Sequence, residues 1–160
     1  MLKIIADKWT KNQNKLREEL TKTNIEFLQY KDLVHLAFKI VYNDDEDAVW
    51  PPNINVDRIT QIDDGNYQGT LLFLLPFDTY QPMECEYLMT YVGYGSCSGC
   101  DTLQRILSLS DGWDAIYPNE RQVSDLMVLC KDILANTICP YYNSPYNNHT
   151  EELKEIKYEA

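Results

Sequence analysis

The spacing of apolar residues changes twice along this chain of 160 residues, and that change restricts the possible folds more than any other feature. Near both ends, apolar side chains recur every three or four residues, as on one face of an amphipathic helix. In the middle third they alternate with polar residues or form short runs, which is typical of strands. The pattern predicts a single α+β domain over 1–160, with about three antiparallel strands flanked by N-terminal and C-terminal helices.

Turn and cap residues set the expected bounds of these elements. Helices are predicted over 3–22, 30–42 and 101–109, and from Asn119 as N-cap, with Gln122 at the third helical position, to a point before Pro140. Strands are predicted over 54–62, 67–75 and 84–94. The second strand is apolar on both faces, which predicts that both faces are covered.

Three local details follow from the same pattern. Gly65 stands in a turn where it can take a positive φ. Asp101 and Gln104 have the spacing of a capping box at the start of a helix. Tyr87 and Tyr91 alternate with other residues of their strand and are predicted to face the core.

Charge is distributed unevenly along the chain, whose formal net charge is -11. Residues 1–40 carry eight basic and five acidic residues, whereas residues 41–101 carry one basic and eleven acidic residues. This balance argues against direct binding of nucleic acid, which needs clustered lysines and arginines. It favours a protein partner with a basic surface, and the predicted acidic contacts are Asp44, Asp45 and Asp47.

The chain shows no signal for a membrane or for secretion. Its apolar runs are shorter than the ~18 residues that span a membrane. Asp7 and Lys8 interrupt the N-terminus where a signal peptide would stay apolar. We therefore expect a cytoplasmic protein without membrane contacts.

Five cysteines, an odd number, predict free thiols in a reducing compartment. Cys97 and Cys100 form a C-x-x-C pair between the last predicted strand and the following helix, and their thiols are expected to lie near each other. Disulfide oxidoreductases place their attacking thiol in this way, because N–H groups at a helix N-terminus stabilise a thiolate. The carboxylate of Asp101 opposes that effect. Thiol-redox catalysis is therefore one hypothesis for this segment.

The same glycine-rich loop admits three other interpretations. As half of a zinc site, Cys97 and Cys100 would need further ligands, for which Cys139 and His149 are the candidates. As an anion site, the loop would offer backbone N–H groups. As a plain turn, its glycines would only let the chain reverse. The polar side chains that would contact a ligand here are Tyr94, Ser96, Ser98 and Asp101. We expect no cofactor.

Twelve tyrosines also point to binding, because tyrosine is enriched at protein interfaces. Tyr141, Tyr142 and Tyr146 stand in a turn-rich segment and are the predicted exposed contacts of this type.

The string YVGYGSCSGCDTLQ, which follows the apolar segment YQGTLLFLLPFDTYQP, resembles a segment of uncharacterised proteins of tailed bacteriophages. The resemblance covers roughly residues 63–107 and implies a small accessory protein in the cytoplasm of an infected bacterium. With the acidic charge and the tyrosines, it predicts a protein that binds a host or defence macromolecule without catalysis. The alternatives are a thiol-redox or metal-dependent enzyme built on Cys97 and Cys100, and a small-ligand binder that holds a nucleotide signal in the glycine-rich loop.

Overall fold

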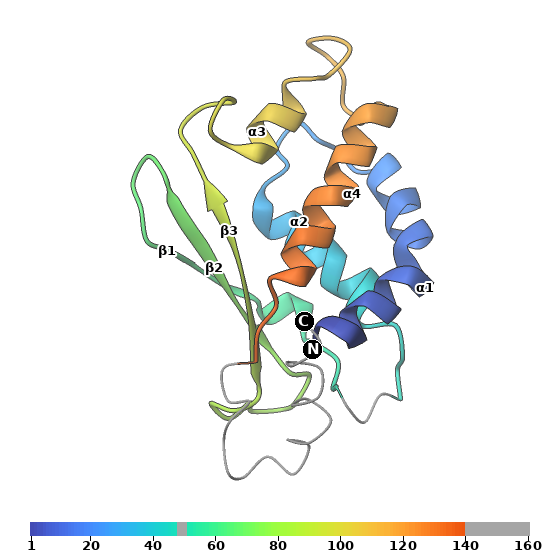
Figure 1. The fold of residues 1–160 in the computed structure, drawn as a ribbon, viewed down its shortest axis with the longest axis vertical. Coiled ribbons are helices and arrows are strands. Elements are labelled where there is room, and N and C mark those ends of the chain that lie inside the picture. Colours follow the sequence, from blue (N-terminus) through green and yellow to red (C-terminus); the bar gives the residue numbers. More distant parts are fainter. Residues whose placement is uncertain (48–50, 140–160) are drawn as a thin grey trace.

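The computed structural model describes residues 1–47 and 51–139, and it has the predicted α+β fold (Figure 1). The described residues form four α-helices and one three-stranded antiparallel sheet. The helices are α1 (Leu2–Thr21), α2 (Tyr30–Ala37), α3 (Thr102–Leu107) and α4 (Glu120–Ala135). The strands are β1 (Thr60–Asp63), β2 (Gly69–Pro76) and β3 (Tyr87–Tyr94). Helix α2 continues into a π-helical turn (Phe38–Tyr42), so the helical segment predicted over 30–42 is confirmed.

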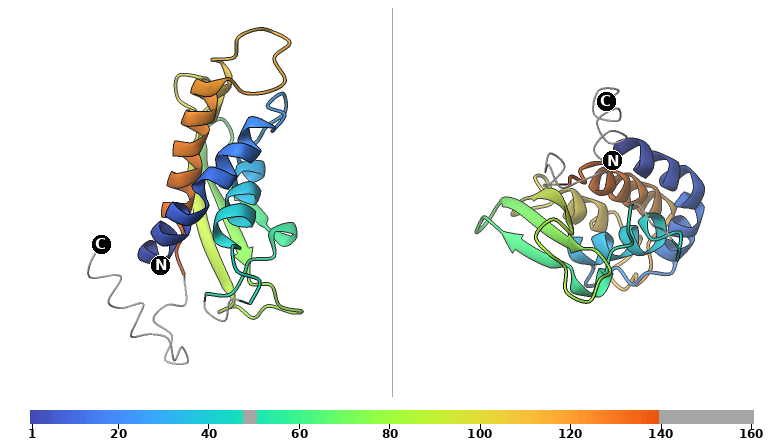
Figure 2. Two further views of the ribbon diagram at one scale, coloured as in Figure 1. Left: turned by 90° about the vertical axis from the view of Figure 1, so that its right-hand side faces the viewer. Right: turned by 90° about the horizontal axis from the view of Figure 1, so that it is seen from below.

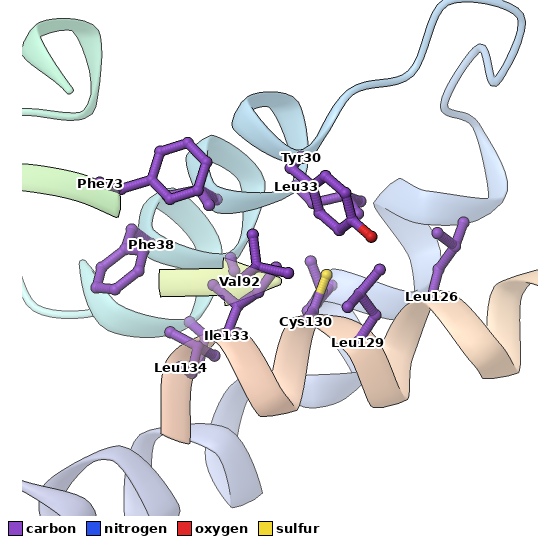
Figure 3. Close-up of a cluster of buried hydrophobic side chains, with 14 of the residues drawn as sticks. Tyr30, Leu33, Phe38, Phe73, Val92, Leu126, Leu129, Cys130, Ile133 and Leu134 are labelled. Atoms are coloured by element: carbon purple, nitrogen blue, oxygen red, sulfur yellow. The ribbon is translucent and has the colours of Figure 1, made fainter. Parts of the chain in front are cut away.

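Helix α4 lies between the sheet and α1, and its packing organises the core (Figure 2). The helix begins with the predicted capping box: Asn119 accepts a hydrogen bond from Gln122 N, and Gln122 accepts one from Asn119 N. Figure 3 shows the side chains of Leu126, Cys130 and Ile133 of α4 pointing toward residues of α2 and β3. This burial explains why the helix carries apolar residues at three- and four-residue spacing.

The sheet has the strand order β1-β2-β3, and helices cover one of its faces in the described part of the chain (Figure 2). On that inner face, Phe73 of β2 pairs with Thr90 of β3, and both are buried. Leu72 pairs with Tyr91 on the outer face, where Tyr91 is 45% exposed. The prediction that β2 is covered on both sides is therefore wrong for the described residues.

The predicted orientation of β3 is also wrong. Leu88, Thr90 and Val92 face the helices, whereas Tyr87 and Tyr91 occupy the alternate positions. A polar Thr90 fits the buried face because its hydroxyl donates a hydrogen bond to the carbonyl oxygen of Ile133 in α4.

Three local predictions need correction. The strand expected over 54–62 is shorter: Ile54 makes an isolated bridge with Phe77, a 3-10 turn (Val56–Arg58) follows, and β1 begins at Thr60. Gly65 does not adopt a left-handed φ; glycine is needed because a Cβ there would lie 2.1 Å from the carbonyl oxygen of Gln68.

The capping box predicted at Asp101 is only half formed. The Asp101 side chain accepts a hydrogen bond from Gln104 N at 2.9 Å, as expected. The Gln104 amide does not return to Asp101, because Asp101 N already donates to the carbonyl oxygen of Cys97 at 2.9 Å. Gln104 donates instead to the carbonyl oxygen of Gly95 at 3.2 Å, which adds a link between α3 and the preceding loop.

Candidate functional site

The loop 95–101, here called the cysteine loop, joins β3 to α3 through a turn closed by its own backbone. The N–H groups of Cys100 and Asp101 both donate to the carbonyl oxygen of Cys97, at 3.1 and 2.9 Å. Gly95 is required because a Cβ atom at this position would lie 2.5 Å from Cys100 Sγ. The close approach of Gly95 to Cys100 therefore explains one glycine of the motif.

The buried carboxylate of Asp101 ties the cysteine loop to the helices. Asp101 is 5% exposed and accepts hydrogen bonds from Gly95 N at 3.0 Å, Gln104 N at 2.9 Å and the Tyr30 hydroxyl at 3.0 Å. The Tyr30 oxygen accepts a hydrogen bond from Leu103 N at 3.1 Å. Burial raises the pKa of Tyr30 to about 12, and the Asp101 carboxylate adds to that increase. Asp101 therefore supports the loop, and its three hydrogen bonds hold both carboxylate oxygens.

The thiols of Cys97 and Cys100 are both exposed, and their sulfur atoms lie 3.0 Å apart, which confirms that the spacing brings them together. The neighbouring Cys97 thiol lowers the pKa of Cys100, and the Cys97 N–H, 3.3 Å from Cys100 Sγ, lowers it further. The predicted source of stabilisation, the N–H groups at the start of α3, is wrong: Leu103 N donates to Tyr30 and Gln104 N to Asp101.

A cavity of about 290 Å³ lies beside the cysteine loop, and its lining includes Tyr94, Gly95, Asp63 and Asp101. The Tyr94 hydroxyl donates to Asp63 Oδ1 at 2.6 Å, and this hydrogen bond raises the pKa of Tyr94 to about 12. The two carboxylates of the lining repel anions, and the Gly95 N–H is already used by Asp101. The cavity therefore opposes the phosphate of a nucleotide.

The exposed polar residues of the same loop, Ser96 and Ser98, point to no particular ligand. Ser96 Oγ lies 4.0 Å from Cys100 Sγ. Both serines remain available to a partner.

Of the candidate zinc ligands that the structure describes, Cys139 is not brought near Cys97 and Cys100. Ile138 forms a bridge with Met89, which places the adjacent Cys139 near the start of β3. The cysteine loop begins at the opposite end of β3, after Tyr94. The distance from Met89 to Tyr94 along the strand is about 17 Å, at ~3.3 Å per residue. His149 lies outside the described residues. Within 1–47 and 51–139, no group of three or more His, Cys, Asp or Glu side chains is arranged to hold a metal.

The acidic run does not form the uniform binding surface predicted for it. The Asp44 side chain is 7% exposed and forms ion pairs with Lys8 and, at 3.0 Å, with Lys11. Burial alone would raise the pKa of Asp44, but hydrogen bonds from Lys8, Lys11 and Asn12 outweigh it and lower the pKa to about 2. Asp44 thus joins α1 to the segment after α2. Asp45 and Asp47 are exposed, as expected.

The structure reveals an apolar surface that sequence reasoning missed. Phe27, Trp113, Ile116 and Tyr117 are all exposed, Phe27 by 79% and Trp113 fully, and we call this set the aromatic end. They come from the loops after α1 and after α3, which are joined by a hydrogen bond of 2.8 Å from Ile25 N to the carbonyl oxygen of Ile116. Both loops lie at the end of the molecule opposite Met1, as does the cysteine loop (Figures 1 and 2).

A groove of about 640 Å³ runs between these two loops. Its lining includes Ile25, Glu26, Leu107, Asp111 and Trp113. The complete lining contains two carboxylate residues and no lysine or arginine. The groove therefore combines apolar surface with negative charge. In the sequence, Trp113 within the turn residues SDGWD was the available signal, because a tryptophan in a turn has little apolar cover.

No protein-family model, curated protein or solved structure matches this chain. None of the described helices has both the length and the apolar composition needed to cross a membrane.

The predicted tyrosine contacts Tyr141, Tyr142 and Tyr146 lie outside the described residues.

Proposed function

We propose that this protein acts by binding a protein partner through the aromatic end. The observation that carries the proposal is the exposure of Phe27, Trp113, Ile116 and Tyr117 on two joined loops. Exposed apolar groups of this size are unfavourable in water, and clustered aromatic residues are typical of the centres of protein interfaces.

The charge of the groove indicates the chemistry of the partner. Glu26 and Asp111 line it, and Asp114 stands beside the exposed Trp113. A partner segment that carries an apolar side chain next to arginine or lysine would complement both features. An arginine side chain could also stack on the face of Trp113 as a cation–π contact. A second copy of this chain is a poor occupant, because two acidic surfaces repel each other.

The biological setting that we propose rests on the resemblance of residues 63–107 to uncharacterised proteins of tailed bacteriophages. An accessory protein in the cytoplasm of an infected bacterium would meet host and defence proteins. We propose such a protein, with a basic surface, as the partner. An inhibitor that mimics DNA would be a special case, in which carboxylates replace phosphates on a DNA-binding protein.

The test is capture of a partner by tagged protein from a lysate of infected bacteria, followed by affinity measurement with the purified partner. The double variant Phe27→Ala with Trp113→Ala should weaken the affinity about 30-fold, because truncating central aromatic residues typically costs at least ~2 kcal/mol. The matched control is Tyr80→Ala, which removes an aromatic side chain that is also exposed but belongs to the loop between β2 and β3.

Two results would overturn the proposal. One is a partner that binds the double variant as tightly as the wild type. The other is self-association through the aromatic end, detected as a dimer in the wild type that the double variant does not form.

Raising the salt from ~50 mM to ~500 mM should weaken binding, because the Debye length falls from about 14 Å to about 4 Å.

A further inference from the structure

Backbone groups and a buried carboxylate hold the cysteine loop, and the Cys100 thiol adds contacts of 3.3 Å to Cys97 N and 3.4 Å to the Cys97 carbonyl oxygen. The turn is closed by hydrogen bonds to the carbonyl oxygen of Cys97 and by the buried carboxylate of Asp101. The sulfur atoms lie instead on the exposed side of the loop, 3.0 Å apart. A purely structural turn would not require two adjacent exposed thiols.

The surroundings of Cys100 favour its reactive form. Its sulfur atom accepts a hydrogen bond from Cys97 N at 3.3 Å and lies 3.0 Å from the Cys97 sulfur. Both contacts stabilise a thiolate, which is the nucleophile in disulfide exchange. The carboxylate of Asp101, which would repel a thiolate, is turned into the core and held by Tyr30 and two backbone N–H groups.

Cys130 shows the opposite case within the same chain. It is buried in the core, where burial raises the pKa of its thiol to about 12. Cys85 is exposed, as the pair is, but its neighbours in the chain are Glu84 and Glu86 rather than a second cysteine. Cys85 is therefore an internal control: an exposed thiol that has no second cysteine beside it in the chain.

We propose that Cys97 and Cys100 form a dithiol site that reduces an exposed disulfide of a second molecule. The Cys100 thiolate attacks one sulfur of that disulfide, which forms a mixed disulfide and releases the other sulfur as a thiolate. Cys97 then gives its proton to water and attacks Cys100 Sγ, which forms the Cys97–Cys100 disulfide and releases the second thiolate. Two electrons pass from the cysteine pair to the bound disulfide, and the two released thiolates take up protons from water.

The loop geometry suits this cycle. The sulfur atoms need to approach by about 1 Å to reach the ~2.05 Å length of a disulfide bond. Gly95 gives Cys100 Sγ room, because any larger residue would place a Cβ 2.5 Å from it. The site shares no residue with the aromatic end, so the two proposals stand or fall separately.

The first experiment uses reduced full-length protein and glutathione disulfide as the probe. Mass spectrometry should find the Cys97–Cys100 disulfide in the wild type and a glutathione adduct on Cys100 in the Cys97→Ser variant, where the second step is blocked. The Cys100→Ser variant should consume glutathione disulfide about 10-fold more slowly, because the remaining thiol has lost its stabilising partner. The Cys85→Ser control should react at the wild-type rate.

A second arm identifies the source of the disulfide. Insulin, whose reduced chains precipitate, serves as a protein substrate in the presence of dithiothreitol at a concentration that alone reacts slowly. Acceleration by the wild type and not by Cys100→Ser would place protein disulfides among the substrates. Reaction with glutathione disulfide alone would restrict the site to small disulfides.

The proposal is overturned if the pair stays reduced in wild-type protein while Cys85 becomes glutathionylated. It is also overturned if Cys100→Ser reacts as fast as the wild type. Thermal melts of both serine variants show whether they fold, and alkylation rates of Cys97 in Cys100→Ser and of Cys100 in Cys97→Ser give a second measurement on folded protein.

Discussion

The cysteine loop and the aromatic end are built in the same way but support different kinds of surface. In each case a residue that caps a helix also holds the neighbouring loop. Asp101 caps α3 and accepts a hydrogen bond from Gly95 N in the cysteine loop. Asn119 caps α4 and donates a hydrogen bond of 2.9 Å to the carbonyl oxygen of Leu109, in the loop that carries Trp113. The cysteine loop has a charged, buried support, whereas the support of the aromatic end is neutral and half-buried. The side chains proposed to react with a disulfide or to contact a partner are exposed in both loops, so substitutions there should affect the proposed function more than stability.

The strongest test of this comparison is Asp101→Ala. The substitution leaves Gly95 N, Gln104 N and the Tyr30 hydroxyl without their acceptor. We expect a loss of about 3 kcal/mol in the free energy of unfolding, since each unsatisfied buried donor costs about 1–3 kcal/mol and relaxation recovers part of the loss. Urea unfolding at neutral pH measures it. Asp101→Asn, which keeps an acceptor, should lose less, and a cost as small as that of a surface substitution would contradict the supporting role.

A substitution of Asp44 tests whether a buried carboxylate that does not cap an α-helix also contributes strongly to the free energy of unfolding. Asp44→Asn removes ion pairs to Lys8 and Lys11 and should lower the free energy of unfolding by about 2 kcal/mol at neutral pH. Its folded pKa of about 2 lies below the ordinary 3.8. This stabilisation is therefore present above pH 3.8 and is lost as the pH falls through about 2.

Urea unfolding of wild type and Asp44→Asn at several pH values checks this dependence. The difference between the two proteins should narrow as the pH falls from 3.8 toward 2. Asp45→Asn, at an exposed neighbour, is the control and should differ little from the wild type at any pH. A difference that stays constant down to pH 2 would show that the ion pairs contribute little.

Asn119, the uncharged N-cap of α4, is the third residue whose contribution to stability can be compared. Asn119→Ala should cost about 1–2 kcal/mol, because the N-cap hydrogen bond to Gln122 N is lost. It also removes the hydrogen bond to the carbonyl oxygen of Leu109, so the loop that carries Trp113 should exchange its amide hydrogens faster. Asn119→Asp keeps the N-cap acceptor but sets a carboxylate beside the carbonyl oxygen of Leu109 and Asp111 Oδ1, so it should recover only part of the stability and still show faster exchange in the loop.

These supports differ in how far the sequence could predict them. The Asn119–Gln122 cap and the proximity of Cys97 to Cys100 involve residues three apart, so local spacing was enough to predict both. Asp44 could not be recognised as buried, because its partners Lys8 and Lys11 come from α1.

The missed surfaces have the same physical cause. The aromatic end draws on two loops far apart in the sequence, which the hydrogen bond from Ile25 N to the carbonyl oxygen of Ile116 connects, and no local pattern records that connection. The orientation of β3 depends on which face α4 covers, since alternation alone gives two equivalent choices. The α+β class followed from periodicity because each element carries its own period.

Replacing the two exposed thiols should have a smaller effect than replacing either support. Cys97→Ser with Cys100→Ser should lower the melting temperature by no more than about 2 °C, because the loop is held through Asp101 and the carbonyl oxygen of Cys97. Differential scanning calorimetry under reducing conditions measures the shift. A drop as large as that of Asp101→Ala would mean that the sulfur atoms are structural, which the exposed positions of both cysteines argue against.

The smallest expected effect on stability is that of Trp113→Ala. The side chain is fully exposed, so its removal withdraws little apolar area from the core and should change the free energy of unfolding by less than about 0.5 kcal/mol. Urea unfolding of this variant beside Phe73→Ala, which empties a buried position of β2 and should cost about 3–5 kcal/mol, gives the contrast. Large destabilisation by Trp113→Ala would show that the indole packs against the groove in solution. The indole would then be part of the fold, and the aromatic end would lose its central residue as a binding surface.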